Sequence, residues 1–168
     1  MTTPSLPEGF SPAITTNWPL PGVRWPAETR DFVGVYALVW KDHAYVGMTV
    51  SNNGFKGRWM RHHRTLFVAK RANSTTKAFR SFIKANGLTA QDFTLYALRT
   101  WPKPEGEATR ELSDEIALVE VEAYDALASA GFSMLNNVRP RGTGYSKPVR
   151  RKRRRRRRTR PAVGAKTP

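Results

Sequence analysis

The sequence predicts an α+β domain in which a small antiparallel three-stranded sheet is flanked by helices, in the order β-β-α-α-β-α. Three short segments are rich in β-branched and aromatic residues, as in strands, and three others carry apolar residues at helical spacing. The chain has 168 residues, enough for one domain of ordinary size and too few for two.

The first three elements are expected to be a hairpin and a helix. Residues 33–40 read as a buried strand, residues 41–43 as a turn, and residues 44–49 as the second strand. An amphipathic helix follows because four residues recur at i, i+4, i+7 and i+11: Phe55, Trp59, His62 and Leu66.

The second half is expected to add two helices and one strand. A helix over about residues 75–86 ends at Gly87, and residues 93–101 make the third strand. Ser113 is expected to cap the last helix, and Gly131 to end it. The predicted domain therefore covers residues 31–138, after a proline-rich N-terminal arm at residues 1–30 and before a disordered arginine-rich tail at residues 139–168.

The positive charge is concentrated in the tail. The chain has 29 Lys and Arg against 13 Asp and Glu, a net charge of +16. Residues 1–138 hold 15 basic and 13 acidic side chains, whereas residues 139–168 hold 14 basic and none acidic. A run such as residues 150–158 repels itself and binds phosphates without reading bases, which favours nucleic acid as partner.

Several classes of protein are excluded or disfavoured by composition. The chain has no cysteine, so disulfides and thiolate ligands or nucleophiles are excluded. It has no glycine-rich phosphate loop, and its longest apolar run, residues 32–40, is too short to span a membrane. The N-terminus lacks the pattern of a signal peptide. We therefore expect a cytoplasmic or nucleoid-associated protein, nuclear if the host is a eukaryote, with no membrane partner.

Two triplets on the hairpin carry the most specific signal. They are Gly34-Val35-Tyr36 on the first strand and Tyr45-Val46-Gly47 on the second. Further along the chain, three features follow in a fixed order: Arg58 and His62 on the next helix, Glu120 and Glu122 on the last helix, and Asn136 and Asn137 after it. In these residues the chain resembles the GIY-YIG nuclease family over residues 33–138, with Val in place of Ile in both triplets and a short spacing between them.

The resemblance implies a metal-dependent endonuclease that hydrolyses DNA phosphodiester bonds with Mg²⁺ or Mn²⁺. By resemblance, Tyr36 takes a proton from the attacking water, Tyr45 orients the water or the phosphate, and Arg58 contacts the scissile phosphate. An ordinary phenol is a poor base at neutral pH, so Tyr36 needs help from the field of the metal or from a neighbour such as His62. Glu122 is the implied metal ligand, with Glu120 as the alternative. Asn136, or Asn137, holds the last loop or the backbone. One carboxylate suffices in principle, because Mg²⁺ keeps most of its waters.

Each of these residues also has an ordinary structural explanation. Tyrosines are common in strands, a histidine on an apolar helix face is often a hydrogen-bonded core residue, and asparagines after a helix are often turn residues. The occurrence of all these residues in one chain favours an active site. A purely structural role does not require two tyrosines, an arginine–histidine pair at i and i+4, and a glutamate at the edge of the apolar face of the last helix to converge on one patch.

Nucleic-acid contacts are predicted in two places. Arg58, Arg61 and Arg64 would border the site, and the tail would add Arg151, Arg153, Arg154, Arg155 and Arg156. The expected partner is double-stranded or branched DNA, cut with little sequence selectivity or under the direction of a protein partner. The alternative is a non-catalytic DNA- or RNA-binding protein on a degenerate GIY-YIG scaffold. In a third interpretation the arginines are an import or membrane-surface signal.

Overall fold

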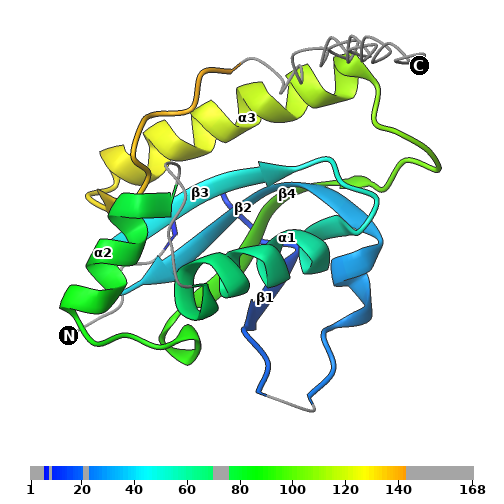
Figure 1. Cartoon of the computed structure of the whole chain (residues 1–168). Helices are drawn as coiled ribbons and strands as arrows, with labels where there is room; N and C mark the ends of the chain where they lie inside the picture. Colours follow the sequence, from blue (N-terminus) through cyan, green and yellow to red (C-terminus); the bar gives the residue numbers. More distant parts are fainter. Residues whose placement is uncertain (1–5, 8, 21–22, 70–75, 143–168) are drawn as a thin grey trace, which may run out of the picture.

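The computed structural model describes residues 6–7, 9–20, 23–69 and 76–142. Three α-helices and a mixed five-stranded sheet form the domain (Figure 1), so the α+β class predicted from the sequence is confirmed. The strands are β1 (Ile14–Asn17), β2 (Phe32–Trp40), β3 (His43–Thr49), β4 (Thr94–Pro102) and β5 (Ser133–Met134). The helical elements are η1 (Ala27–Arg30), α1 (Gly54–His63), the π-helical turn η2 (Arg64–Val68), α2 (Lys77–Ala85), η4 (Ala90–Asp92) and α3 (Arg110–Ser129).

The prediction of a three-stranded antiparallel sheet is wrong at both edges. The predicted strands form the centre of the sheet, whose full order is β1-β4-β2-β3-β5. β1 comes from the proline-rich arm and pairs antiparallel with β4, with Ile14 opposite Ala97. β5 follows α3 and pairs parallel with β3. Both edge strands are too short to show a period-2 pattern, and their partners lie far away in the sequence.

Helices cover both faces of the sheet (Figure 1). The odd-numbered residues of β2, such as Val35 and Ala37, pack in the same apolar cluster as the buried side of α3. Tyr36 and Leu38 point to the other face, where α1, η2 and α2 contribute the second cluster. Tyr36 lies opposite Gly47, and Leu38 lies opposite Tyr45. Both motif tyrosines therefore project from one face of the sheet, toward α1 and α2.

The helices follow the predicted patterns except at their starts. The four residues predicted to form the buried face of α1 and η2 are all buried: Phe55, Trp59, His62 and Leu66. Gly87 and Gly131, beyond the ends of α2 and α3, have positive φ as expected for helix stops. α3 begins earlier than predicted, because Thr109 caps it by accepting a hydrogen bond from the Leu112 amide, and Ser113 lies inside the helix.

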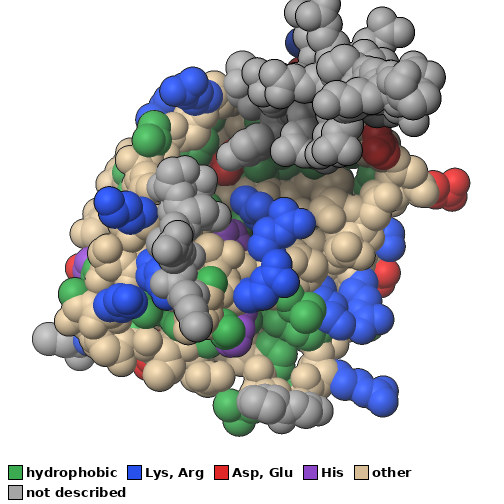
Figure 2. Space-filling model, viewed as in Figure 1, with side chains coloured by type: hydrophobic (Ala, Val, Ile, Leu, Met, Phe, Trp, Pro, Cys, Tyr) green, Lys and Arg blue, Asp and Glu red, His purple; other side chains and the backbone are tan. Residues whose placement is uncertain are grey.

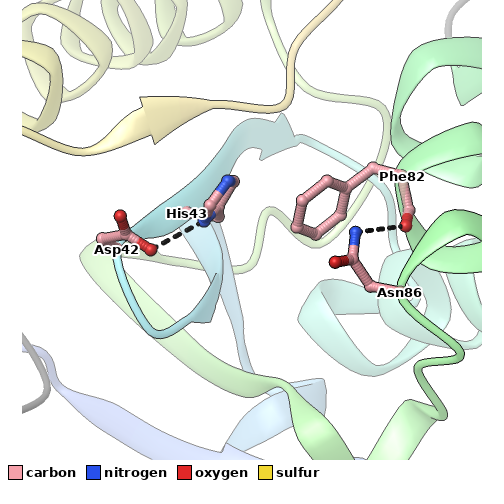
Figure 3. Close-up of polar contacts among 4 residues, drawn as sticks. All are labelled: Asp42, His43, Phe82 and Asn86. Atoms are coloured by element: carbon pink, nitrogen blue, oxygen red, sulfur yellow. Dashed lines mark hydrogen bonds and ion pairs between the residues drawn. The ribbon is translucent and has the colours of Figure 1, made fainter. Parts of the chain in front are cut away.

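The tip of the β2–β3 hairpin packs against α2 (Figure 3). The ring of His43 stacks on Phe82 of α2, with 4.5 Å between ring centroids. His43 Nδ1 lies 2.8 Å from Asp42 Oδ1, and Asn86 Nδ2 donates to the Phe82 carbonyl over 2.9 Å. This contact fixes α2 beside the face that bears the two tyrosines.

Both ends of the described chain pack on the domain. Trp18 is buried, and its indole donates to the Trp59 carbonyl over 3.2 Å. Arg139, inside the predicted tail, donates to Asp125 on α3. The remaining tail from residue 143 onward, with the five arginines named above, lies outside the described residues. Within the described ranges, no helix is both long and apolar enough to cross a membrane.

Candidate functional site

The hydroxyl group of Tyr36 is the centre of a buried polar group. Tyr36 is fully buried on β2, and its Oη lies 2.6 Å from Nε2 of His62 on α1. Arg58, one turn earlier on α1, donates from Nε to the same oxygen over 3.0 Å. The helical i, i+4 spacing therefore aims both α1 side chains at one strand residue.

The charge state of His62 decides where the phenolic proton lies. Burial, together with the nearby charges of Arg58 and Arg61, lowers the pKa of His62 to about 3, so the imidazole is neutral at physiological pH. Tyr36 Oη accepts from Arg58 and has its own proton to place in a buried environment. We infer that Tyr36 donates this proton to Nε2, which puts the imidazole proton of His62 on Nδ1.

Tyr45 completes the aromatic wall of the group. Its ring centroid lies 5.2 Å from that of His62, and it stacks on Phe79 of α2 at 5.3 Å. Tyr45 is 4% exposed. The two motif tyrosines therefore contact the same histidine from adjacent strands.

The glycines of the two triplets have different structural roles. A Cβ atom at Gly47 would overlap the hydroxyl end of Tyr36, so Gly47 makes room for the phenol beside α1. Gly34 has φ +142°, and a Cβ there would overlap the Arg99 carbonyl of β4. It lies next to the register shift between β2 and β4 at Val35/Tyr36. The glycine of each triplet is thus required by the local packing, whatever role the triplets have besides.

Glu120 on α3 is the carboxyl group associated with this centre. Burial raises its pKa to about 7, and the charge of Arg58 acts against that rise. An interaction with Arg58 strong enough to affect the pKa puts the carboxyl group and the guanidinium in the same electrostatic environment. At neutral pH, Glu120 is therefore present in both protonation states.

Glu122, the residue favoured by the resemblance, lies elsewhere. It is exposed and lines a hollow of about 240 Å³ with Leu98 and Arg99 of β4. Helical spacing could have separated the two glutamates, because Glu120 lies on the buried stripe of α3 and Glu122 lies two residues, or about 200°, away. The buried residues of that stripe are Ile116, Ala117, Ala123 and Leu127.

Asn136 and Asn137 hold backbone rather than reach toward Tyr36. The side-chain amide of Asn136 accepts from the Val46 amide over 2.9 Å and donates to the Val46 carbonyl over 2.7 Å. Val46 is the middle residue of the second triplet. Asn137 Oδ1 accepts from the Ala78 amide in the first turn of α2. The structure therefore links Asn136 to the triplet and Asn137 to α2.

Basic side chains surround the surface above α1. Arg61 and Arg64 are exposed, and Arg58 is half-buried. Figure 2 shows Lys and Arg side chains over α1 and α2 on this face, with acidic side chains at its margins. The arginine tail, the other predicted contact, falls outside the described residues.

The donor set fits a hard divalent cation only through a single carboxylate. Among the residues that the structure describes, no three His, Cys, Asp or Glu side chains gather into a metal-binding cluster. Glu120 offers carboxylate oxygen, the ligand type that Mg²⁺ prefers, and Mg²⁺ is commonly held by one or two carboxylates with waters and substrate phosphate. The residues present are therefore compatible with such an ion.

These contacts bring together Tyr36, Tyr45, Arg58 and His62 from β2, β3 and α1, and Asn136 holds the backbone of β3 beside them. Glu120 on α3 is linked to this group only through the charge of Arg58. These contacts do not include Glu122. No protein-family model, curated protein or solved structure matches the chain.

Proposed function

We propose that the chain is a divalent-metal-dependent endonuclease that hydrolyses DNA phosphodiester bonds. The observation that carries the proposal is the meeting of a phenol, an imidazole and a guanidinium at one oxygen, with a partly buried carboxyl group in the field of that guanidinium. Titratable groups with perturbed pKa values that converge from separate elements are typical of active sites. We propose that the protein acts in the cytoplasm or at the nucleoid and that its substrate is double-stranded or branched DNA.

Arg58 supplies positive charge for the reaction. Phosphodiester hydrolysis builds negative charge on the nonbridging and leaving oxygens, and a planar guanidinium stabilises such charge through paired N–H donors. Arg58 is only half-buried, so it extends from the buried phenol toward the surface. It is the member of the group best situated to meet the scissile phosphate.

Tyr36 and His62 form a route for one proton. The attacking water gives a proton to Tyr36 Oη while the phenolic proton moves to Nε2 of His62, so the charge of the new imidazolium is balanced by the substrate phosphate. Because Tyr36 is fully buried, water reaches it only if neighbouring side chains move when substrate binds. The ring of Tyr45 packs against that of His62 and helps to hold the imidazole in place.

Glu120 is the carboxylate that we propose as metal ligand, in place of Glu122. A bound Mg²⁺ or Mn²⁺ would supply Lewis-acid stabilisation of charge on the phosphate oxygens. The carboxyl group must be ionised to act as a ligand, and its raised pKa makes this step sensitive to pH near neutrality. Asn136 has a supporting role, because it fixes the backbone of the Tyr45-Val46-Gly47 triplet.

One observation favours the alternative of a non-catalytic nucleic-acid-binding protein. Tyr36 and Tyr45 are both almost completely buried, as expected if the polar group serves only to hold α1 on the sheet. In that case the basic surface binds DNA or RNA, and the motif residues are structural. The two functions differ in whether the phosphodiester bond is cut.

The test compares the two neighbouring glutamates. Supercoiled plasmid is incubated with the wild-type chain, Glu120→Gln and Glu122→Gln, with Mg²⁺ or with a chelator, and plasmid binding is measured in parallel. We expect wild-type cleavage that the chelator abolishes, a loss of at least about a hundredfold in Glu120→Gln, and near wild-type cleavage in Glu122→Gln.

If all three proteins still bind the plasmid, a loss of cleavage reports on bond hydrolysis and not on DNA binding. Loss in Glu122→Gln alone would transfer the ligand role to that residue. Binding without cleavage by the wild-type chain under any of these metal conditions would replace the endonuclease by the non-catalytic alternative.

A further inference from the structure

A basic hollow lies beside the candidate site, between the N-terminal segment and the start of α1. It has a volume of about 660 Å³, and its lining includes Arg24, Trp25, Arg30, Asp31 and Lys56. Basic side chains flank this part of the molecule on the face that also presents α1 (Figure 2). None of these residues belongs to the group around Tyr36.

The hollow is built on a fixed junction. Gly54, the first residue of α1, has φ +57°, and a Cβ there would lie 2.7–2.9 Å from the carbonyl oxygens of Thr29, Arg30 and Phe32. Thr29 is fully buried and donates from its hydroxyl to the Pro26 carbonyl over 2.6 Å. The backbones that carry Arg30 and Lys56 are therefore held in close contact before any ligand binds.

The charge of the hollow favours an anion. Three cationic side chains and one carboxylate line it, and they come from two segments of the chain, residues 23–31 and the start of α1. Lys56 lies in the first turn of α1, which contains no acidic residue. The positive end of the helix dipole adds to the field of these side chains.

Trp25 gives the hollow an aromatic surface. Its ring packs against Trp59 with 5.8 Å between centroids, and the half-buried side chain also lines the hollow. An aromatic ring supported from behind and bordered by Arg and Lys is the combination that binds single-stranded nucleic acid, because bases stack on the ring while the cations meet the phosphates. A small anion alone would gain nothing from the indole.

We propose that this hollow binds an unpaired stretch of the nucleic-acid strand next to the scissile phosphate. Trp59 links the hollow to the candidate site, because its ring centroid lies 5.8 Å from that of Trp25 and 6.3 Å from that of Tyr36. A strand with one phosphate at Arg58 therefore has its neighbouring nucleotides within reach of the hollow. The inference rests on the proposed function and sharpens its substrate to DNA in which an unpaired strand meets the cutting position. Trp25 stacks on a base, and Arg24, Arg30 and Lys56 pair with its flanking phosphates.

The test measures strand preference in the presence of a chelator, so that no cleavage is needed. Binding of the full chain to a labelled oligothymidine of about 12 nucleotides and to a duplex of the same length is followed by fluorescence anisotropy at about 0.2 M salt, where the uniform electrostatic contribution is weakened. We expect the wild-type chain to prefer the single strand by roughly tenfold, as one or two stacked bases would give.

The decisive variants change charge by equal amounts in two places. Arg24→Glu with Arg30→Glu is expected to abolish the preference for the single strand. Lys77→Glu with Lys84→Glu changes exposed positions of α2. This pair is expected to weaken binding of the single strand and of the duplex by the same factor, so that the preference for the single strand remains. Trp25→Ala should remove the preference, and Trp25→Phe should restore most of it.

The outcomes separate this inference from the proposed function. A wild-type chain without preference for the single strand, or a preference unchanged by the Arg24/Arg30 pair or by Trp25→Ala, overturns the inference even if the plasmid is cleaved. The strand preference with its loss in these variants supports the hollow as a binding site even if no cleavage occurs.

Discussion

Glu120 is a carboxyl group in a position where an apolar side chain would stabilise the fold more. It lies on the buried stripe of α3, and burial raises its pKa to about 7 from the ordinary 4.5. Between these values the folded chain binds more protons than the unfolded chain. Stability contributed by this group therefore falls as pH rises from about 4.5 to about 7.

Replacing Glu120 by Gln removes this dependence. Relative to wild type at the same pH, Glu120→Gln is expected to gain up to about 3 kcal/mol in free energy of unfolding between about pH 5 and pH 8. Urea denaturation in the presence of a chelator measures it, and Glu122→Gln, at an exposed position, serves as the control. If wild type and Glu120→Gln show parallel pH profiles, Glu120 is ionised in the folded chain without penalty, and its assignment as the carboxyl group with the raised pKa is wrong.

His62 changes stability with pH in the opposite direction. Its pKa is lowered from 6.5 to about 3, so its contribution to stability is present above pH 6.5 and is lost as pH falls toward 3. The wild-type chain is therefore expected to be most stable at mildly acidic pH, and the two titrations are separated only by comparing variants at each pH. The pKa of Glu120 lies between pH 6 and 8 and that of His62 lies far below it, so we expect activity in this range to rise as Glu120 ionises.

Much of the group around Tyr36 could be predicted from residue spacing. Helical period placed Arg58 and His62 on one side of α1, and the hairpin placed Tyr36 and Tyr45 on adjacent strands. Glu120 could not be chosen over Glu122 by resemblance, although its position on the stripe of α3 distinguishes it. The proton positions at Tyr36 and His62 depend on burial, which no local pattern gives.

Gly47 determines how closely the β2–β3 hairpin and α1 approach each other. The hydroxyl end of Tyr36 occupies the space where a Cβ at Gly47 would lie. Any side chain on β3 at this point would push the phenol away from Arg58 and His62. The second triplet therefore shapes the hydrogen bonds of the first.

Gly47→Ala tests this dependence. We expect a loss of about 1–3 kcal/mol in stability from overpacking and at least about a tenfold loss of cleavage, with the helix and strand content unchanged by circular dichroism. Gly106→Ala is a matched control, because a Cβ there meets nothing within 4 Å. Full cleavage by a folded Gly47→Ala variant would mean that the position of the Tyr36 hydroxyl does not matter to the reaction.

The central elements were predictable and the edges were not. β2, β3 and β4 carry long runs of strand-forming residues, whereas β1 has four residues and β5 has two. β1 is joined to β4 by pairs such as Ile14 with Ala97. Such pairing is decided by tertiary packing, so neither propensity nor period reveals it.

The largest cluster of positive charge and the candidate site lie in different parts of the chain. Residues 145–168 hold 12 of the 29 basic side chains and no acidic one, and none of the group around Tyr36 lies there. The folded part described by the structure has a basic surface over α1 and α2 (Figure 2). Binding strength and bond cleavage should therefore respond to different deletions.

A chain ending at Gly144 tests this separation. Its affinity for duplex DNA should fall, and the slope of log Kd against log salt should become shallower by about 0.9 for each phosphate that the tail neutralises in the full chain. Cleavage at low salt and saturating protein should stay within about threefold of the full chain, because the tail then adds little to occupancy. A salt slope equal to that of the full chain would show that the tail does not bind DNA.

Asn136 has a consequence for association that its link to the second triplet does not suggest. β5 pairs with only His43 and Ala44 of β3, and the amide group of Asn136 then occupies both hydrogen-bonding groups of Val46. Unpaired backbone groups on an edge strand are a template for a strand from another molecule. The side chain of Asn136 thus continues the pairing of the two-residue strand β5. The backbone N–H and C=O of Val46 are then occupied, and a strand of another molecule cannot pair with β3 through them.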